Sequence, residues 1–306
     1  MEIFFTLVIK LLPLYAFVLL GYLTGKFFSF KKEFLAPLLI YIIAPVVIFA
    51  GVVSTQLNIS MLSIPVLFFV LCSIASLTIY YLAGFIWKDS TKNILAFSAG
   101  TANTGYFGLP VAVALFGHNA IPIVALALLG TSLYTNSFGF FLAAKGQHTT
   151  KESFTKVLQL PILYAFFLGI LVNMLHIHMW PVYFSVISIF NQAFTVLGMM
   201  LVGIALADIT IYKFDIKFIT LSLLTKFFFW PFCMICILLV DSYTYKIYDA
   251  SLYPVFILLS IIPVAVNIVS YATILKTHPE KVSLTVFIST LFALFYIPIV
   301  AALFLK

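Results

Sequence analysis

The chain is a succession of long apolar stretches separated by short polar breaks. A helix that crosses a bilayer needs about 20 consecutive, mostly apolar residues. Division of the sequence at its charged or turn-rich breaks yields ten such stretches, here numbered as spans 1 to 10: residues 3–25, 34–53, 61–87, 93–116, 120–144, 157–175, 182–207, 218–240, 251–275 and 282–305. The pattern therefore predicts an all-α polytopic membrane protein with ten transmembrane helices.

Composition supports this prediction and excludes a soluble enzyme or binding domain. Hydrophobic residues make up 64% of the 306 residues and charged residues only 8%, whereas a soluble domain carries roughly 25% charged residues. The net charge of +7 comes from lysines scattered between the apolar stretches, so it does not indicate nucleic-acid binding. The cysteines and histidines show no metal-site spacing, and no cofactor is expected. The lipid bilayer is the medium that surrounds the chain.

The placement of the lysines predicts the orientation, because positively charged loops stay on the cytoplasmic side. The opposite connections hold only Lys246 and the terminal Lys306. The connections after the odd-numbered spans hold twelve lysines: Lys26, Lys31, Lys32, Lys88, Lys92, Lys145, Lys151, Lys156, Lys213, Lys217, Lys276 and Lys281. Both termini are therefore predicted to be extracytoplasmic in a multi-pass protein of the cell (inner) membrane.

The longest polar stretch, residues 145–156, divides the chain into two sets of five spans and is predicted to be a cytoplasmic linker. Because five is odd, the second set, 157–306, must run upside down relative to the first, 1–144. This is the arrangement of an inverted-topology repeat. The fourth span of each set carries a proline and an asparagine near its middle, which agrees with such a repeat.

Spans 4 and 9 are the candidate site. Span 4 contains three glycines, Asn103 and Pro110 within its central residues 98–110, and span 9 contains Pro263 and Asn267. Glycine and proline weaken the helical hydrogen-bond ladder, which favours two interrupted helices that cross near the membrane centre. The half-helix N-termini would carry partial positive charge suited to a carboxylate. The alternatives are a small-residue packing face for the glycines and helix–helix hydrogen bonds for the amides.

The charged residues within the spans indicate which solute such a site would accept. All nine acidic residues fall at span ends or in loops, and proton or cation sites usually use buried carboxylates. This favours a neutral or anionic solute, although backbone carbonyls could still bind sodium. Lys226, within span 8, would balance an anionic solute or brace the interrupted helices. Alternatively, its ammonium snorkels to the cytoplasmic interface.

Several motifs resemble those of one transporter family. They are Leu12-Pro13-Leu14-Tyr15 with Gly21-Tyr22 in span 1, Ala44-Pro45 in span 2, Asn103-Thr104-x-x-x-Gly108-x-Pro110 in span 4, and the stretch from Pro263 to His278-Pro279 in span 9. Together they resemble the auxin efflux carrier family, which includes the plant PIN-formed auxin exporters and short bacterial permeases. The short central linker points to a bacterial-type permease. The chain also departs from the plant exporters at Ile268, where they carry a second proline.

The resemblance implies a fold, an assembly and a site. Spans 1, 2, 6 and 7 would form a scaffold, and spans 3–5 and 8–10 a moving transport domain, in a homodimer that works by an elevator-like motion. The substrate-binding residues that it implies are Asn103, Thr104, Gly108, Pro110, Pro263 and Asn267.

The function expected from the sequence is secondary transport of a small organic anion, a carboxylate, by alternating access. A proton or sodium ion could drive it, and the sequence leaves that choice open. The alternatives are a sodium-coupled carrier of the bile-acid type or a channel. An intramembrane enzyme would need a paired nucleophile and base, or metal ligands on one helix face, and the spans contain neither.

The orientation can be tested at Ser153, within the predicted cytoplasmic linker. A Ser153→Cys variant should not react with an impermeant thiol reagent added to intact cells, and should react after the membrane is permeabilised. Labelling from the outside of intact cells would reverse the predicted topology.

Overall fold

The structure is a computed structural model that describes residues 2–28, 30–54, 58–144, 161–177, 179–207 and 215–304. Within these ranges the chain forms helices and short connections and contains no strand, as predicted. The predicted linker 145–156, including Ser153, lies outside the described residues. The boundary between two five-span halves therefore remains a prediction.

Among the described residues, seven helical stretches are long and apolar enough to cross a membrane, and the chain is a multi-pass membrane protein. They coincide with predicted spans 1, 2, 3, 5, 7, 8 and 10: Leu11–Phe28, Phe34–Val53, Ile59–Ile86, Ala120–Ala144, Val182–Ala207, Ile216–Tyr243 and Pro279–Leu303. The described part of span 6 is the shorter helix α10 (Pro161–Met174). Spans 4 and 9 are interrupted, so ten crossings remain a prediction.

Several crossing helices contain a short π-helical turn. Such turns occur at η1 (Leu39–Ile43) in span 2, η3 (Thr135–Gly139) in span 5 and η4 (Thr225–Phe229) in span 8. π-helical turns are rare in proteins, and those that occur are often found at functional sites. The α-helices in these and the other uninterrupted spans are α1 (Glu2–Phe28), α2 (Lys32–Leu38), α3 (Ala44–Val53), α4 (Ile59–Ile86), α7 (Ala120–Tyr134), α8 (Phe140–Ala144), α11 (Pro181–Ala207), α12 (Ile216–Leu224), α13 (Trp230–Tyr243) and α16 (Pro279–Phe304).

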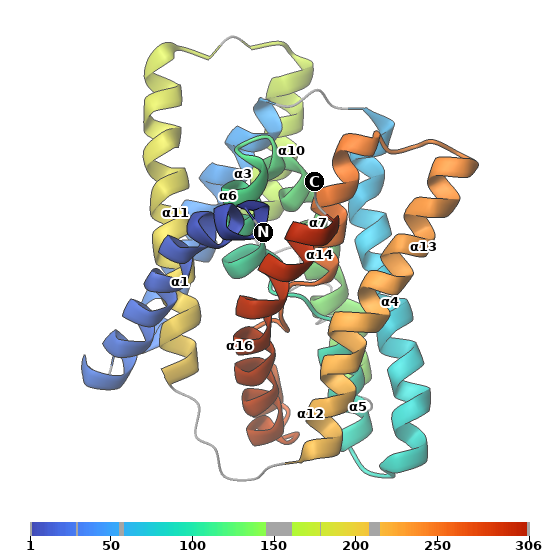
Figure 1. The fold of residues 1–306 in the computed structure, drawn as a ribbon. Helices are drawn as coiled ribbons and strands as arrows, with labels where there is room; N and C mark the ends of the chain where they lie inside the picture. Colours follow the sequence, from blue (N-terminus) through green and yellow to red (C-terminus); the bar gives the residue numbers. More distant parts are fainter. Residues whose placement is uncertain are drawn as a thin grey trace.

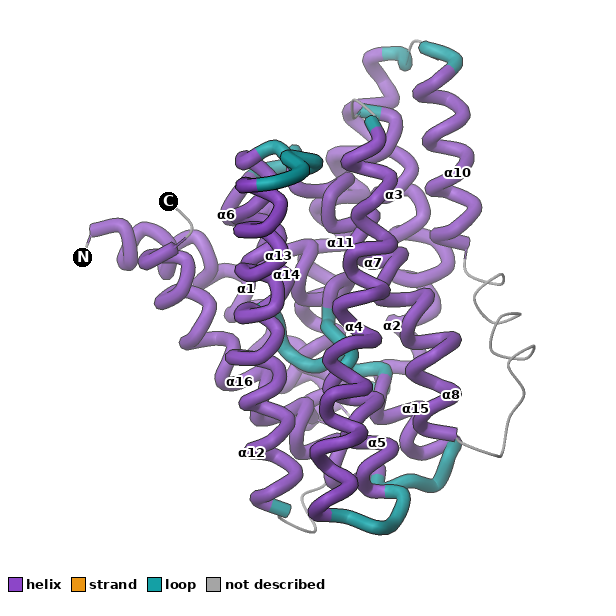
Figure 2. The backbone as a smooth tube through the Cα atoms, turned by 90° about the vertical axis from the view of Figure 1, so that its right-hand side faces the viewer, coloured by secondary structure: helices purple, strands orange, loops and turns teal. Residues whose placement is uncertain are grey.

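Both predicted interruptions are present. Span 4 consists of α5 (Thr91–Ala99), η2 (Thr104–Gly108) and α6 (Leu109–Phe116), with non-helical backbone between α5 and η2. Span 9 consists of α14 (Tyr253–Ser260), preceded by the short turn η5 (Ala250–Leu252), and α15 (Ile268–Ile274). Figure 2 shows non-helical stretches in the interior of the bundle, far from its ends. The discontinuous helices that glycine and proline predicted are therefore confirmed.

The helices pack in two groups. The first contains α1, α2, α3, α10 and α11, in which α1 packs on α11 and α3 packs on α10. The second contains α4, α5, α7, α8 and the helices from α12 to α16, in which α4 packs on both α5 and α7. In Figure 1, α1 and α11 lie on the left and α4, α12 and α13 on the right. The two groups also contact each other directly, α1 with α16 and α3 with α7, and helix α6 and turn η2 contact both groups.

Glycines set the close approach of α1 and α11. A Cβ atom at Gly203 would clash with the backbone carbonyl of Val18, and one at Gly21 would clash with that of Met200. Small residues at such positions let helix backbones approach closely, which drives helix association in lipid. The pair forms the most extensive helix contact in the first group.

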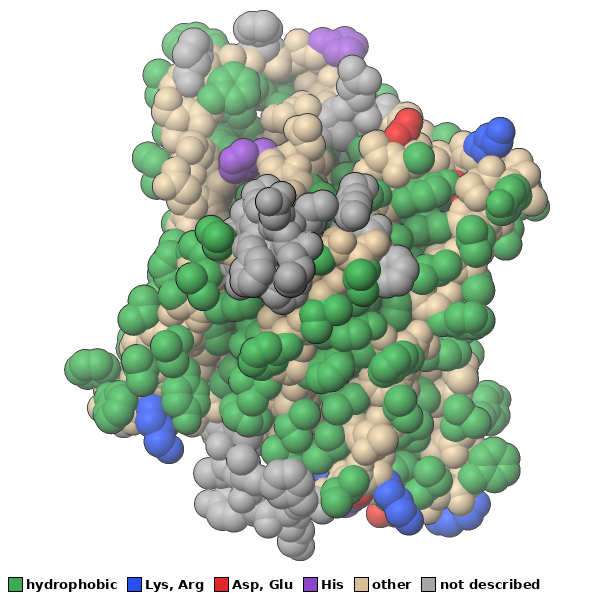
Figure 3. All heavy atoms as spheres, in the orientation of Figure 1, with side chains coloured by type: hydrophobic (Ala, Val, Ile, Leu, Met, Phe, Trp, Pro, Cys, Tyr) green, Lys and Arg blue, Asp and Glu red, His purple; other side chains and the backbone are tan. Residues whose placement is uncertain are grey.

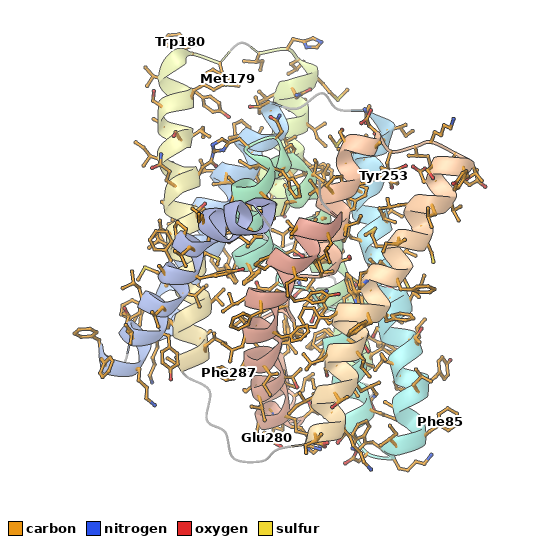
Figure 4. The ribbon with its side chains drawn as sticks, in the orientation of Figure 1. Phe85, Met179, Trp180, Tyr253, Glu280 and Phe287 are labelled. Atoms are coloured by element: carbon orange, nitrogen blue, oxygen red, sulfur yellow. The ribbon has the colours of Figure 1, made fainter. Side chains whose placement is uncertain are left out.

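The surface has apolar sides and polar ends. Figure 3 shows hydrophobic side chains over most of the visible face, with the lysines mostly at the lower end and the histidines at the upper end. Glu280 and Phe85 lie at the lower end in Figure 4, opposite Met179 and Trp180. This separation matches the alternating ends expected for connections that follow odd- and even-numbered spans.

An ion pair joins two helices at the lysine-rich end. The Lys281 ammonium of α16 lies 2.9 Å from Asp215, and the other oxygen of Asp215 accepts a 3.1 Å hydrogen bond from the Phe218 N–H at the start of α12. Burial acts to raise the pKa of Asp215, but the bonds from Lys281 and Phe218 outweigh it and hold the pKa below its usual value. The carboxylate is therefore ionised at neutral pH and caps α12.

Candidate functional site

The two interrupted helices meet and bond at their breaks. The Asn103 backbone N–H donates a 2.9 Å hydrogen bond to the Pro263 carbonyl. A Cβ atom at Gly108 would lie 3.1 Å from Ile262 and 3.3 Å from Leu259, at the end of α14. Spans 4 and 9 thus meet at their breaks through a direct backbone contact, at the point where the sequence predicts their crossing.

Three surrounding helices bond carbonyls at the end of α5, two of which, those of Ala96 and Phe97, also accept from the Gly100 N–H. A helix terminus lacks intrahelical partners for its last four carbonyls. At the end of α5, the Ser76 hydroxyl bonds the Ala96 carbonyl at 2.8 Å, the Tyr134 hydroxyl bonds that of Phe97 at 3.3 Å, and the Trp230 indole N–H bonds that of Ala99 at 2.7 Å. Helices α4, α7 and α13 therefore hold the end of α5 in place.

The second interruption has its own polar supports. The Ser289 hydroxyl of α16 accepts a 3.3 Å hydrogen bond from the Val264 N–H. On α15, the Tyr271 hydroxyl donates a 2.6 Å hydrogen bond to the side-chain carbonyl of Asn136 in η3. The Tyr271 ring also packs edge-on against Phe97 of α5. These contacts tie α15 to spans 4 and 5.

Lys226 is fully buried beside the end of α5. Its side chain is 0% exposed, and its Nζ has no hydrogen-bond partner among the described residues. Nζ lies 3.5 Å from the centroid of the Trp230 ring, a cation–π contact. Lys226 does not snorkel to the interface. It also does not bond the carbonyls at the end of α5, because its Nζ has no hydrogen-bond partner among the described residues.

The remaining predicted site residues have different environments. Asn103 is 4% exposed, and its amide Nδ2 has no partner among the described residues. Asn267 is exposed and lies directly before α15. The structure records no hydrogen bond between these two side chains. Thr104, Gly108, Pro110 and Pro263 are buried close to the crossing. The structure therefore brings the two backbones together at the breaks while leaving the two amides in unlike surroundings.

A groove lies between the two helix groups, on the side of the connection from α6 to α7. It consists of two adjoining cavities of about 320 and 300 Å³ that share His118, Ile121 and Asn191. Leu109 and Val113 of α6 line the larger cavity. Because α6 continues directly from the interruption of span 4, the groove runs along this helix toward the crossing. No pattern in the sequence indicates this groove, because its lining residues come from separate helices.

The groove contains one polar group that lacks a partner. The side-chain oxygen of Asn191 on α11 is buried and makes no hydrogen bond among the described residues. Asn103 and Asn267 do not line either cavity. The crossing is therefore separated from the groove in this arrangement of the helices.

The described residues contain no group of three His, Cys, Asp or Glu side chains that could hold a metal ion. The buried carboxylate Asp241 lies at the end of α13 and accepts hydrogen bonds from the Ile247 and Tyr248 N–H groups and the Tyr253 hydroxyl, at 2.8, 3.1 and 3.1 Å. These bonds give Asp241 a structural role in the connection between α13 and α14.

Comparison with known proteins connects this architecture with transport. No family model matches the chain. An uncharacterised transporter of Methanocaldococcus jannaschii is 29% identical to it over 136 residues, which are 42% of this chain and 44% of that protein. The chain thus spans less than half the length of this relative. The multi-span helical structure and this partial similarity are both consistent with a transporter.

Removal of the hydrogen bond from Trp230 to α5 should lower the free energy of unfolding. A Trp230→Phe variant should lose about 1–3 kcal/mol of unfolding free energy, because the buried Ala99 carbonyl would lose its partner. The measurement is a denaturant titration of the purified protein in micelles. Trp180→Phe, at a position that is 79% exposed, is the control and should change stability by less than 0.5 kcal/mol or so. Equal effects of both changes would contradict the role of Trp230.

Proposed function

We propose that this protein is a secondary transporter that carries a small organic anion, a carboxylate, across the cell membrane. The observation that carries the proposal is the crossing of two interrupted helices through the Asn103–Pro263 hydrogen bond. Secondary transporters place their substrates at such discontinuous helices, where half-helix ends supply partial charges. The transporter with partial similarity to the chain supports this class.

The charges around the crossing favour an anion. Lys226 is buried with an unbonded ammonium, and a buried charge is costly unless it has a partner. The unpartnered Nδ2 of Asn103 adds a hydrogen-bond donor at the break. An ammonium and an amide donor together match a carboxylate. Among the described residues, no acidic side chain contacts Lys226 to supply this partner permanently.

The separation of the crossing from the groove supports alternating access. Asn103 is buried, whereas the groove opens between the two helix groups along α6. A solute can reach Asn103 only if the groups move relative to each other. We propose that this is an elevator-like motion of the second group against the first. It would occur in a homodimer of chains with ten spans in two inverted repeats, with both termini outside the inner membrane.

Two other functions would give different results in a transport assay. A sodium-coupled carrier of the bile-acid type would require a sodium gradient, and a channel would give flux that neither saturates nor supports counter-transport. We propose that the protein is not an enzyme.

The test of the proposed function uses proteoliposomes and a panel of mono- and dicarboxylates, screened first by the rise in unfolding temperature. Uptake of the strongest ligand is then measured under imposed proton or sodium gradients.

Lys226→Gln tests the need for the buried charge. This variant should abolish carboxylate uptake while expression and unfolding temperature stay near those of the wild type, because glutamine keeps a polar side chain but loses the ammonium. Lys217→Gln, at an exposed position at the start of α12 in the same span, is the matched control and should transport normally. Lys226→Met should fail like Lys226→Gln if charge is required. Normal uptake by both Lys226 variants would show that Lys226 only packs against Trp230.

The two amides can be tested by affinity. Asn267→Ala should weaken binding of the screened carboxylate only slightly, because water can replace the amide at this exposed position. Asn103→Ala should weaken it by about 1–3 kcal/mol, the cost of leaving a buried partner unpaired. This corresponds to a roughly ten- to hundredfold rise in Kd. Asn103→Asp should bind more weakly than Asn103→Ala, because an added negative charge repels an anion in a poorly screened site. The measurement is calorimetry on the purified protein.

Asn173→Ala serves as the control for this series. The Asn173 amide bonds the carbonyls of Val52 and Val53 at 3.1 and 2.9 Å, away from the crossing, so its loss should leave the affinity unchanged. Normal binding by both Asn103→Ala and Asn267→Ala would show that these amides join helices and do not contact the solute. Tighter binding by Asn103→Asp than by Asn103→Ala would overturn the anion assignment.

A further inference from the structure

A separate pocket lies at the lysine-rich end of the second helix group. It has a volume of about 360 Å³ and is lined by residues from the ends of α4 and α8, the start of α5 and the turn between α15 and α16: Tyr80, Lys88, Asp89, Ser90, Lys92, Asn93, Ala143, Ala144 and Thr277. None of these residues belongs to the crossing or to the groove. The pocket is therefore distinct from the proposed transport site.

Two lysines place positive charge on this pocket. The Lys88 ammonium donates a 2.7 Å hydrogen bond to the Gly84 carbonyl, and the Lys92 ammonium lies 5.2 Å from the centroid of the Tyr80 ring. Neither ammonium forms an ion pair within the described residues. Both can therefore approach an anion in the pocket, while their contacts with Gly84 and Tyr80 keep them near its wall.

The one acidic residue of the lining is engaged by other groups. Asp89 accepts a 3.1 Å hydrogen bond from the Thr91 N–H, and its carboxylate lies 3.9 Å from Nε2 of His278. Burial acts to raise the pKa of Asp89, but the bonds from Thr91 and the nearby His278 and Lys281 outweigh it and lower the pKa. The ionised lining carries a net charge of +1, from two lysines against one aspartate.

A buried hydroxyl in the lining has no partner. Thr277 is 8% exposed, and its Oγ1 forms no hydrogen bond among the described residues. Leaving such a group unbonded is costly. On either side of it, Lys276 and His278 have positive φ angles of 53° and 47°, which are uncommon for residues other than glycine. The turn thus holds Thr277 in the pocket wall at the expense of backbone strain.

The start of α5 forms a further part of the pocket wall. The Asn93 amide donates a 2.8 Å hydrogen bond to the Leu142 carbonyl, which joins the start of α5 to α8. The start of α5 also directs the positive end of its helix dipole toward this end of the molecule. The pocket therefore offers two ammonium groups, a hydroxyl donor and a helix N-terminus to one ligand.

We propose that this pocket binds a phosphate group at the predicted cytoplasmic face. Phosphate accepts hydrogen bonds from ammonium and hydroxyl donors and is stabilised at helix N-termini. Basic pockets between transmembrane helices on the cytoplasmic side bind the head groups of anionic phospholipids. The same chemistry would accept a soluble phosphate monoester. In either case the ligand stabilises the contact of α4, α5 and α8 with the turn between α15 and α16.

The experiment compares lipid and soluble sources of the phosphate group. The protein is reconstituted in nanodiscs of phosphatidylcholine alone or with phosphatidylglycerol, and lipid retention is measured by native mass spectrometry. Inorganic phosphate and glycerol phosphate are added separately to the phosphatidylcholine sample, and the unfolding temperature is recorded. The variant is Lys88→Gln/Lys92→Gln. Its matched control is Lys26→Gln/Lys31→Gln, which removes two exposed lysines outside the pocket.

The wild type should be stabilised by one of these probes, and Lys88→Gln/Lys92→Gln should lower that affinity about tenfold or more, since each lysine contributes to phosphate attraction. Stabilisation by phosphatidylglycerol alone identifies a lipid site, and stabilisation by the soluble phosphates identifies a site for a cytoplasmic metabolite. Thr277→Val should weaken binding without lowering the stability of the ligand-free protein, because it removes an unbonded hydroxyl. No response of the wild type to any probe overturns the proposal. An equal loss of affinity in Lys26→Gln/Lys31→Gln also overturns the proposal, because the lysines would then act only through general attraction to anions.

Discussion

The structure depends on how the backbone at the break in span 4 is hydrogen-bonded. Lipid offers no partner to an open carbonyl, so irregular backbone persists at membrane depth only where protein or water surrounds it. Here Trp230 supplies a partner to the Ala99 carbonyl, and Ser76 and Tyr134, from two other helices, add second hydrogen bonds to the Ala96 and Phe97 carbonyls that Gly100 already bonds. A Cβ atom at Gly100 would clash with the Tyr134 hydroxyl and the Cys72 carbonyl. The break therefore determines which helices surround α5 and how closely they pack.

The same contacts connect the buried charge to the crossing. Trp230 bonds the end of α5 through its indole N–H and contacts the Lys226 ammonium through its ring face. A change in the charge of Lys226 would thus act on the residue that holds α5. On the other side of the break, Asn103 bonds Pro263. The buried lysine, the end of α5 and the contact with span 9 are thus linked through neighbouring residues.

The two cavity systems lie in different parts of the molecule. The groove is lined by residues of both helix groups, whereas the lysine-lined pocket lies entirely within the second group. If the groups move relative to each other, the groove must change shape. The pocket can keep its shape because the Asn93–Leu142 bond and the packing of α4 on α5 lie inside one group. A phosphate bound there would accordingly stabilise the second group as a unit.

The sequence by itself determined the features that depend on local chemistry. Apolar stretches located the crossing helices, Gly100, Asn103 and Pro263 located the two breaks, and the lysines predicted which ends of the helices lie together. Only the tertiary structure decided the partners at each break. Trp230 and Ala99 are 131 positions apart, and Tyr271 and Asn136 are 135 apart. No periodicity or spacing encodes such pairs, since they arise when helices from distant segments pack. The groove at Asn191 and the pocket at Thr277 likewise exist only between helices, so no single stretch of sequence could reveal them.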